Sequence, residues 1–144
     1  MNTETATSYA ALILRLSLGV MFVAHGLLKV LVFTLPGTVG FFDSIGYPGW
    51  MAYAVVTAEL GGGALMIFGI QTRWVAVALL PVLLGAAQVH FANGWLFTAE
   101  GGGWEYPVFL VMATIVQALL GDGAHAVRVP SFKETYGVSS RELS

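Results

Sequence analysis

The chain has 144 residues, of which 57% are hydrophobic and only 10% are charged, so it has too little polar surface to cover a soluble globule. Its net charge is −2 and no block of one sign occurs, which excludes electrostatic binding of nucleic acid. The chain contains no cysteine, which excludes disulfides, iron–sulfur clusters, thiol redox chemistry and covalently attached haem. Composition therefore predicts an integral membrane protein, in which any redox role needs an external cofactor.

Four segments have the length or the character of membrane spans: about Ser8 to Phe33, Trp50 to Ile70, Trp74 to Phe91 and Tyr106 to Leu120. The first follows a leader without Lys or Arg, so it is predicted to be a retained helix and not a cleaved signal peptide. The turn Gln71 to Arg73 is so short that the second and third spans must be antiparallel neighbours.

The last span is short for a bilayer, which leaves two alternatives. Either its helix extends past Gly121 toward Val127, or it starts below the surface in a re-entrant loop. In the loop after the first span, Val39, Phe42 and Ile45 recur every third residue, which predicts a short amphipathic helix on the membrane. The predicted fold class is all-α, a four-helix transmembrane bundle over residues 1–127, with a polar tail over residues 128–144.

Basic residues outside the predicted spans indicate the orientation in the membrane. They lie in the short turn and in the tail, at Arg73, Arg128, Lys133 and Arg141. The loops on the opposite side carry Asp43, Glu100 and Glu105 and no Lys or Arg. Because positive residues stay on the cytoplasmic side, both termini are predicted to be cytoplasmic.

Three basic residues share one face of the first helix, at Arg15, His25 and Lys29. Each Arg or Lys costs about 2.5–3.5 kcal/mol at the centre of a bilayer, so the stripe must face the bundle and find partners. His25 lies on the first helix and Glu59 on the second. Each lies roughly 12–14 Å below the outer end of its own helix. Glu59 is therefore predicted to pair with His25, with Lys29 or with both. Arg15 lies nearer the inner end, where Gln117 and backbone carbonyls are its predicted partners.

Gln88 and His90 lie at a similar depth on the third helix, but two residues span about 200° of a helix, so both cannot face the interior. Gln88 is the predicted interior residue, because it shares a face with Pro81 and Leu84, and His90 is predicted to turn toward the outer loop. Glu105 is predicted at the mouth of the last helix, where the helix dipole favours a carboxylate.

Several of these residues have alternative roles. Lys29 can extend to the lipid headgroups, and the two histidines can be structural hydrogen-bonding groups. A haem held by His25 and His90 is disfavoured, because the two residues differ in depth and His90 faces the loop.

Three runs resemble the DoxX family of small bacterial membrane proteins: RLSLGVMFVAHGLLK, AELGGGALMIFGIQTR, and VHFANGW followed by GGGWEYP. The resemblance implies a four-helix inner-membrane protein linked to redox systems, including a thiosulfate to quinone electron-transfer system. The matching polar positions are Arg15, Lys29, Glu59, Arg73, His90, Glu105 and Tyr106. The match favours His90 as a site residue despite its predicted direction.

The leading hypothesis is an electron-transfer or oxidative-stress protein with a lipid-accessible quinone-like site in the outer half of the bundle. Tyr106 and one histidine would donate to the ring, and Glu59 would relay a proton. The predicted catalytic residues are Glu59, His25 and His90, and the predicted binding residues are Arg15, Lys29, Gln88, Glu105 and Tyr106; no metal is predicted.

Two other functions compete with this hypothesis. One is a non-catalytic accessory or scaffold subunit, whose polar cluster only fixes the register of the helices. The other is a small-molecule transporter, which is weakened by the lack of an inverted repeat. The predicted partners are the lipid bilayer and either a membrane or periplasmic protein or a second copy of the chain. Whether the chain is itself an enzyme, such as a quinone-linked oxidoreductase subunit, stays open.

Overall fold

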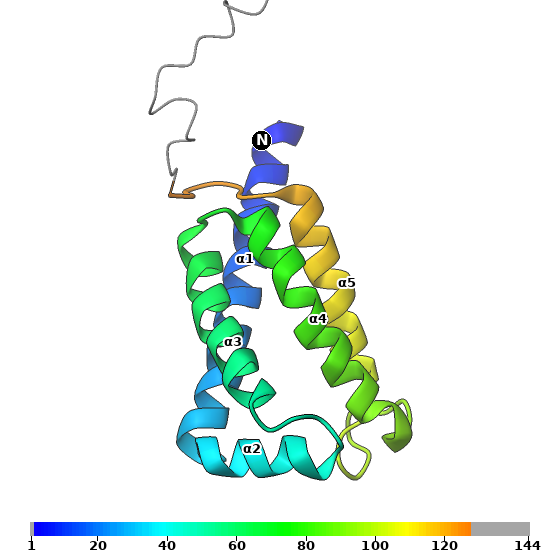
Figure 1. Ribbon diagram of the computed structural model, residues 1–144. Coiled ribbons are helices and arrows are strands. Elements are labelled where there is room, and N and C mark those ends of the chain that lie inside the picture. Colours follow the sequence, from blue (N-terminus) through cyan, green and yellow to red (C-terminus); the bar gives the residue numbers. More distant parts are fainter. Residues whose placement is uncertain (1, 128–144) are drawn as a thin grey trace, which may run out of the picture.

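The computed structural model describes residues 2–127 and shows a bundle of helices (Figure 1). Four helices form its body: α1 (Thr3–Leu27), α3 (Met51–Phe68), α4 (Thr72–His90) and α5 (Glu105–Leu120). A fifth, α2 (Leu35–Ser44), lies across one end, where the sequence predicts a short amphipathic helix. A π-helical segment η1 (Leu28–Val32) prolongs α1, and a 3₁₀ turn η2 (Phe91–Asn93) prolongs α4. The all-α fold class is confirmed, and the predicted tail lies outside the described residues.

Three helical segments are long and apolar enough to cross a membrane: Thr3–Val32, Met51–Phe68 and Thr72–Asn93. Helix α5 has 16 residues, or about 24 Å, against a hydrocarbon core of about 30 Å. It ends at Leu120, and Gly121 follows with a φ of 82°. The predicted alternative in which this helix extends toward Val127 is therefore wrong, because Gly121 terminates it.

Helix α1 packs closely on α3 through facing glycines. A Cβ atom added to Gly19 would lie 2.9 Å from the carbonyl oxygen of Gly63, and one added to Gly63 would lie 2.8 Å from that of Gly19. The two backbones can approach this closely only because neither residue has a side chain. Gly19 and Gly63 therefore determine how closely α1 and α3 approach.

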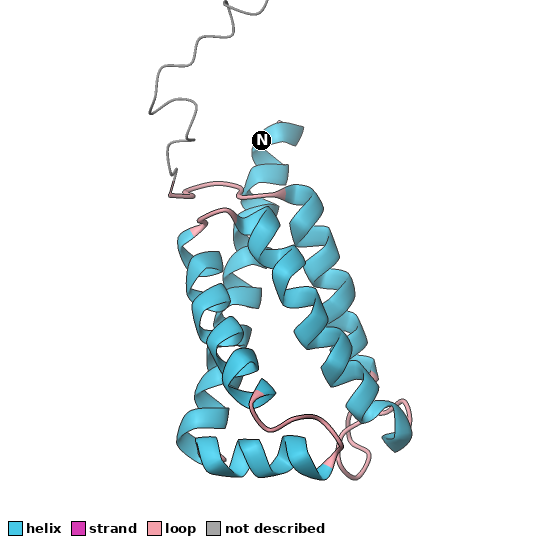
Figure 2. Cartoon of the chain, in the orientation of Figure 1, coloured by secondary structure: helices cyan, strands magenta, loops and turns pink. Residues whose placement is uncertain are grey.

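The four long helices form two pairs that diverge toward α2. Helices α1 and α3 form one pair, α4 and α5 the other, and Figures 1 and 2 show the space between the pairs widening toward α2. A core of apolar side chains joins the pairs, at Leu18, Phe22, Met66, Ala76, Leu79, Leu83 and Leu110. The pairs thus stay together toward the end distant from α2, the closed end, and three of these residues, Phe22, Leu83 and Leu110, reach the space between the pairs.

Arg15 is buried at that closed end, with 1% of its surface exposed. Its Nη2 atom donates to the carbonyl oxygen of Ala124 at 3.1 Å, as predicted for a backbone partner. The predicted partner Gln117 is wrong, because its amide nitrogen donates to the carbonyl of Gly121 at 2.7 Å and makes no bond to Arg15. Asp122 accepts from the backbone N–H of Thr72 at 2.7 Å. The segment after α5 therefore folds back and closes this end.

Candidate functional site

A cavity of about 1040 Å³ lies between the diverging helix pairs, beside α2. Most of its lining is apolar, from residues such as Met21, Phe22, Phe41, Phe42, Val55, Leu83, Leu84 and Leu110. Its polar lining is confined to eight residues: His25, Lys29, Thr38, Tyr47, Glu59, Gln88, His90 and Tyr106. An apolar cleft with a few convergent polar groups is the usual form of a small-molecule site.

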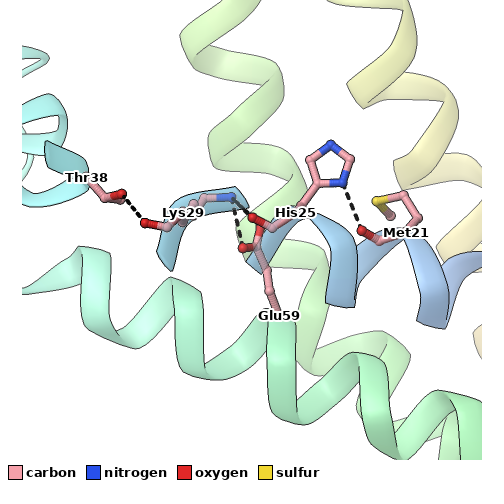
Figure 3. Close-up of polar contacts among 5 residues, drawn as sticks. All are labelled: Met21, His25, Lys29, Thr38 and Glu59. Atoms are coloured by element: carbon pink, nitrogen blue, oxygen red, sulfur yellow. Dashed lines mark hydrogen bonds and ion pairs between the residues drawn. The ribbon is translucent and has the colours of Figure 1, made fainter. Parts of the chain in front are cut away.

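Lys29 and Glu59 form an ion pair in the wall of this cavity (Figure 3). The Nζ atom of Lys29 donates to both carboxylate oxygens of Glu59 at 2.8 Å. The side chains are 21% and 7% exposed, so the pair is largely withdrawn from its surroundings. The prediction that Glu59 neutralises the basic stripe is confirmed for Lys29.

The π-helical segment η1 and helix α2 together position Lys29. A π-helical turn leaves backbone carbonyls outside the regular hydrogen-bond pattern, and such turns are frequent at functional sites. The hydroxyl oxygen of Thr38, the buried residue of α2, lies 3.0 Å from the carbonyl oxygen of Lys29 and 2.9 Å from that of Thr34 (Figure 3). Helix α2 is thereby attached to the segment that carries the lysine.

His25 lies one helical turn before Lys29 but makes a different contact. Its Nδ1 atom lies 2.8 Å from the carbonyl oxygen of Met21, and its ring stacks near Tyr106, with centroids 6.4 Å apart and planes 28° apart. In residues 2–127 the carboxylate of Glu59 bonds to Lys29 and not to His25. Of the two predicted partners, only Lys29 therefore bonds to the carboxylate in this part of the chain.

His90 ends α4 and contacts the glycine-rich loop, as predicted. Its Nδ1 atom lies 3.0 Å from the carbonyl oxygens of both Gly101 and Gly102. The side-chain amide of Asn93 donates to the same two carbonyls at 3.0 and 2.9 Å. His90 also lines the cavity, so the loop contact and a place in the site are compatible.

Gln88, which was predicted to face the interior of the bundle, lines the cavity between the helix pairs and is not packed against another helix. The buried face of α4 carries Thr72, Ala76, Leu79, Leu83 and Ala87, whereas Gln88 is exposed. Because α4 diverges from α3, the face with Gln88 lines the cavity and does not pack on a helix. The Oε1 atom of Gln88 accepts from the hydroxyl of Tyr47 at 3.0 Å, across the cavity mouth.

The amino-acid sequence of the chain is similar to those of known proteins. It matches the DoxX family over residues 10–101. The chain belongs to the DoxX family. It is 38% identical over 111 residues to the "Putative oxidoreductase CatD" of Bacillus subtilis (strain 168), which covers 76% of this chain and 78% of CatD. It is 32% identical over 121 residues to the "Inner membrane protein YqjF" of Escherichia coli (strain K12), covering 81% of this chain and 87% of YqjF. No solved structure matches it.

Membership of the DoxX family makes this chain a multi-pass inner-membrane protein in contact with the lipid bilayer. The family match runs from residue 10, within α1, to residue 101, in the loop before α5. It therefore includes seven of the eight polar cavity residues. Tyr106, the eighth, follows the matched range. The cavity is thus built almost wholly from the part of the chain that this family shares.

Two predicted binding residues of this DoxX-family protein do not line the cavity. Arg15 lies at the closed end of the bundle. Glu105 begins α5, as predicted, and its Oε1 atom accepts from the backbone N–H of Phe97 at 2.7 Å, which ties the preceding loop to the helix. Both residues make contacts that hold the fold, and neither reaches the cavity.

Sequence reasoning missed Thr38 and Tyr47 as cavity residues. Thr38 lies within the predicted amphipathic helix, where only the apolar spacing was recognised, and Tyr47 lies in the loop that follows this helix. Within residues 2–127 the DoxX-family chain has no group of three or more His, Asp or Glu residues placed to hold a metal ion. The chemistry of the cavity rests on the ion pair, two histidines, two tyrosines, a threonine and an amide.

Proposed function

We propose that this protein is a membrane component of an electron-transfer or oxidative-stress system and binds a quinone-like, lipid-soluble ring in the cavity. The observation that carries the proposal is the cavity itself, which combines an apolar lining with a carboxylate and two histidines. The name of the relative CatD, a "Putative oxidoreductase", supports the redox assignment.

The residues present suit such a ring in size and polarity. The cavity volume of about 1040 Å³ lies just above the range of about 300–1,000 Å³ that is typical of ligand sites. This volume is large enough for a ring and part of a hydrophobic tail. Phe33, Phe41 and Leu84 line the cavity. Their exposed fractions are 61%, 50% and 55%, respectively. In a bilayer these exposed apolar residues face lipid, so a lipid-soluble molecule can enter from the side.

A quinone supplies the chemistry of taking up two electrons and two protons on reduction. Tyr106 and the free amide nitrogen of Gln88 can donate hydrogen bonds to ring oxygens, because the Oε1 atom of Gln88 already holds Tyr47. Glu59 can hold a proton beside the ring, and Lys29 balances its charge when the proton leaves. The electrons would pass to or from a protein partner.

A short-chain quinone analogue tests this proposal through thermal stability. At 100 times its Kd, a ligand of the native state adds about 2.7 kcal/mol, so the analogue should raise the melting temperature of the purified protein. Tyr106→Phe and Glu59→Gln should each reduce the shift, because each removes a group that can exchange a hydrogen bond or a proton with a quinone, whereas His90→Gln should change the shift little.

Matched controls are available outside the cavity. Tyr53→Phe, His125→Gln and Glu100→Gln change the same residue types at exposed positions that do not line it, and these variants should keep the full shift. A wild-type protein without any shift at saturating analogue, and without quinone after purification from native membranes, would refute the quinone site.

A non-catalytic accessory subunit is the second candidate function. The Lys29–Glu59 pair satisfies both charges within the protein, which is what a purely structural register contact requires. In that case the purified protein would carry no quinone and would depend on an obligate protein partner. Isolation in native lipids therefore separates the two functions.

We also propose that the closed end of the bundle faces the cytoplasm. The N-terminus, the turn before α4 and the segment after α5 lie at one end, and α2 and the loop before α5 lie at the other (Figure 1). Arg73 lies at the first of these ends, while the loops at the other end carry acidic and no basic residues. The basic residues predicted in the tail lie outside the described part of the chain.

Single cysteines test this orientation, because the chain has none of its own. In intact spheroplasts, Asn2→Cys and Val127→Cys should be shielded from a membrane-impermeant thiol reagent, whereas Thr98→Cys should react. All three positions are exposed, unlike the buried Thr72. Reaction at Val127 together with protection at Thr98 would reverse the topology.

A further inference from the structure

The two cavity histidines use the same ring nitrogen for a backbone contact. The Nδ1 atom of His25 lies 2.8 Å from the carbonyl oxygen of Met21, and that of His90 lies 3.0 Å from the carbonyls of Gly101 and Gly102. A carbonyl oxygen can only accept a hydrogen bond, so in both rings Nδ1 must carry the proton. Backbone contacts of this kind select the tautomer of a histidine.

This tautomer leaves the other ring nitrogen of each histidine as an acceptor. In a neutral imidazole with a protonated Nδ1, Nε2 has a lone pair and no proton. Figure 3 shows the second nitrogen of His25 on the side of the ring away from the Met21 carbonyl. Among residues 2–127, the hydrogen bonds of both rings are made by Nδ1 alone. Both residues line the cavity, and within residues 2–127 the Nε2 atom of each makes no hydrogen bond.

Within residues 2–127 no neighbouring donor, the hydroxyl of Tyr106 included, bonds to either Nε2 atom. The ammonium of Lys29 donates to both oxygens of Glu59, and the hydroxyl of Tyr47 donates to Gln88. A ligand therefore has to bring its own donor if it is to bond to either Nε2 atom. A quinone carbonyl cannot do so, because it is itself only an acceptor.

We infer that the cavity is selective for a hydroxyl-bearing aromatic ring, a hydroquinone or a phenol, whose hydroxyl donates to Nε2 of His25 or His90. The inference rests on the proposed ring-binding function and names the form of the ring that binds best. It reverses the donor role that the sequence analysis assigned to the histidines, because the proton of each ring is held by a backbone carbonyl.

Nitrogen NMR of histidine-labelled protein tests the tautomers directly. The chain has three histidines, and His25→Gln and His90→Gln each remove one pair of ring signals and so assign them. In spectra recorded at about pH 8, both rings should show a protonated Nδ1 and a bare Nε2. A protonated Nε2 with a bare Nδ1 in both rings would overturn the inference.

Three probes with the same alkyl chain test the selectivity: a 4-alkylphenol, its methyl ether and a quinone. The phenol and the ether differ in one hydrogen-bond donor and neither is readily reduced. The wild-type protein should bind the phenol about two- to tenfold more tightly than the ether, the range expected for one neutral hydrogen bond. The quinone should bind less tightly than the phenol, because neither of its carbonyl oxygens can donate to an Nε2 atom.

Variants assign this preference to the histidines. In the double variant His25→Phe with His90→Phe, the phenol to ether ratio should fall to about one, whereas His125→Phe, outside the cavity, should leave it unchanged. The wild-type ratio decides the matter even if the double variant does not fold. If the quinone binds and the phenol and ether bind equally, the inference fails and the proposed function stands. If none of the three binds, both fail.

Discussion

Replacing Glu59 with glutamine is expected to destabilise the bundle by about 2–3 kcal/mol, measured as the free energy of unfolding in detergent. The change leaves the ammonium of Lys29 in the cavity wall without its two carboxylate contacts. Breaking a fully buried pair costs about 3–5 kcal/mol, and the 21% exposure of the Lys29 side chain places this one below that range.

A double-mutant cycle shows whether the two residues interact. Adding Lys29→Met to Glu59→Gln removes the uncompensated charge and should recover part of the lost stability. Glu100→Gln removes a carboxylate from an exposed loop position and should change stability little. If the double variant loses as much as the two single variants together, the ion pair makes no contribution to the fold.

Replacing Gly63 with alanine is expected to cost about 1–3 kcal/mol, because the new methyl group cannot fit between α1 and α3. Its Cβ atom would lie 2.8 Å from the carbonyl oxygen of Gly19 and 2.9 Å from the backbone nitrogen of Val23. Both are backbone atoms, so relief requires movement of a whole helix and not a change of rotamer.

Gly61 provides a control within the same helix. A Cβ atom there would have no neighbour within 4 Å, so Gly61→Ala should be neutral or stabilising by up to about 1 kcal/mol through its higher helix propensity. Unfolding of both variants in detergent gives the comparison. Equal stability of the two alanine variants would mean that α1 and α3 do not cross at Gly63.

A cavity at this place has a consequence for how the protein tolerates charge. The apolar core keeps the helix pairs together at the closed end, and the separation of the pairs near α2 leaves room for polar side chains that a packed core would exclude. The ion pair and both histidines lie in this wider half. The same divergence that loosens the packing therefore creates the site.

Helix positions and the main charge pairing were predictable from the sequence. Apolar runs of sufficient length have to form helices in a bilayer, because every backbone polar group must be satisfied within the segment. The three basic residues on one face of α1 required a carboxylate, and Glu59 was the only acidic residue on a span at the right depth. These conclusions depend on local spacing and on the cost of an unpaired charge, both of which a sequence displays.

The partners of the other polar residues were decided only by the tertiary structure. The angular position of Gln88 on α4 was predictable, but not that α4 diverges from α3 and leaves this face beside a cavity. Arg15 and both histidines bond to backbone carbonyls, at Ala124, Met21, Gly101 and Gly102. Every residue has such a carbonyl, so no residue type marks the one that accepts. The tautomers of His25 and His90 follow from these contacts, and a sequence carries no sign of them.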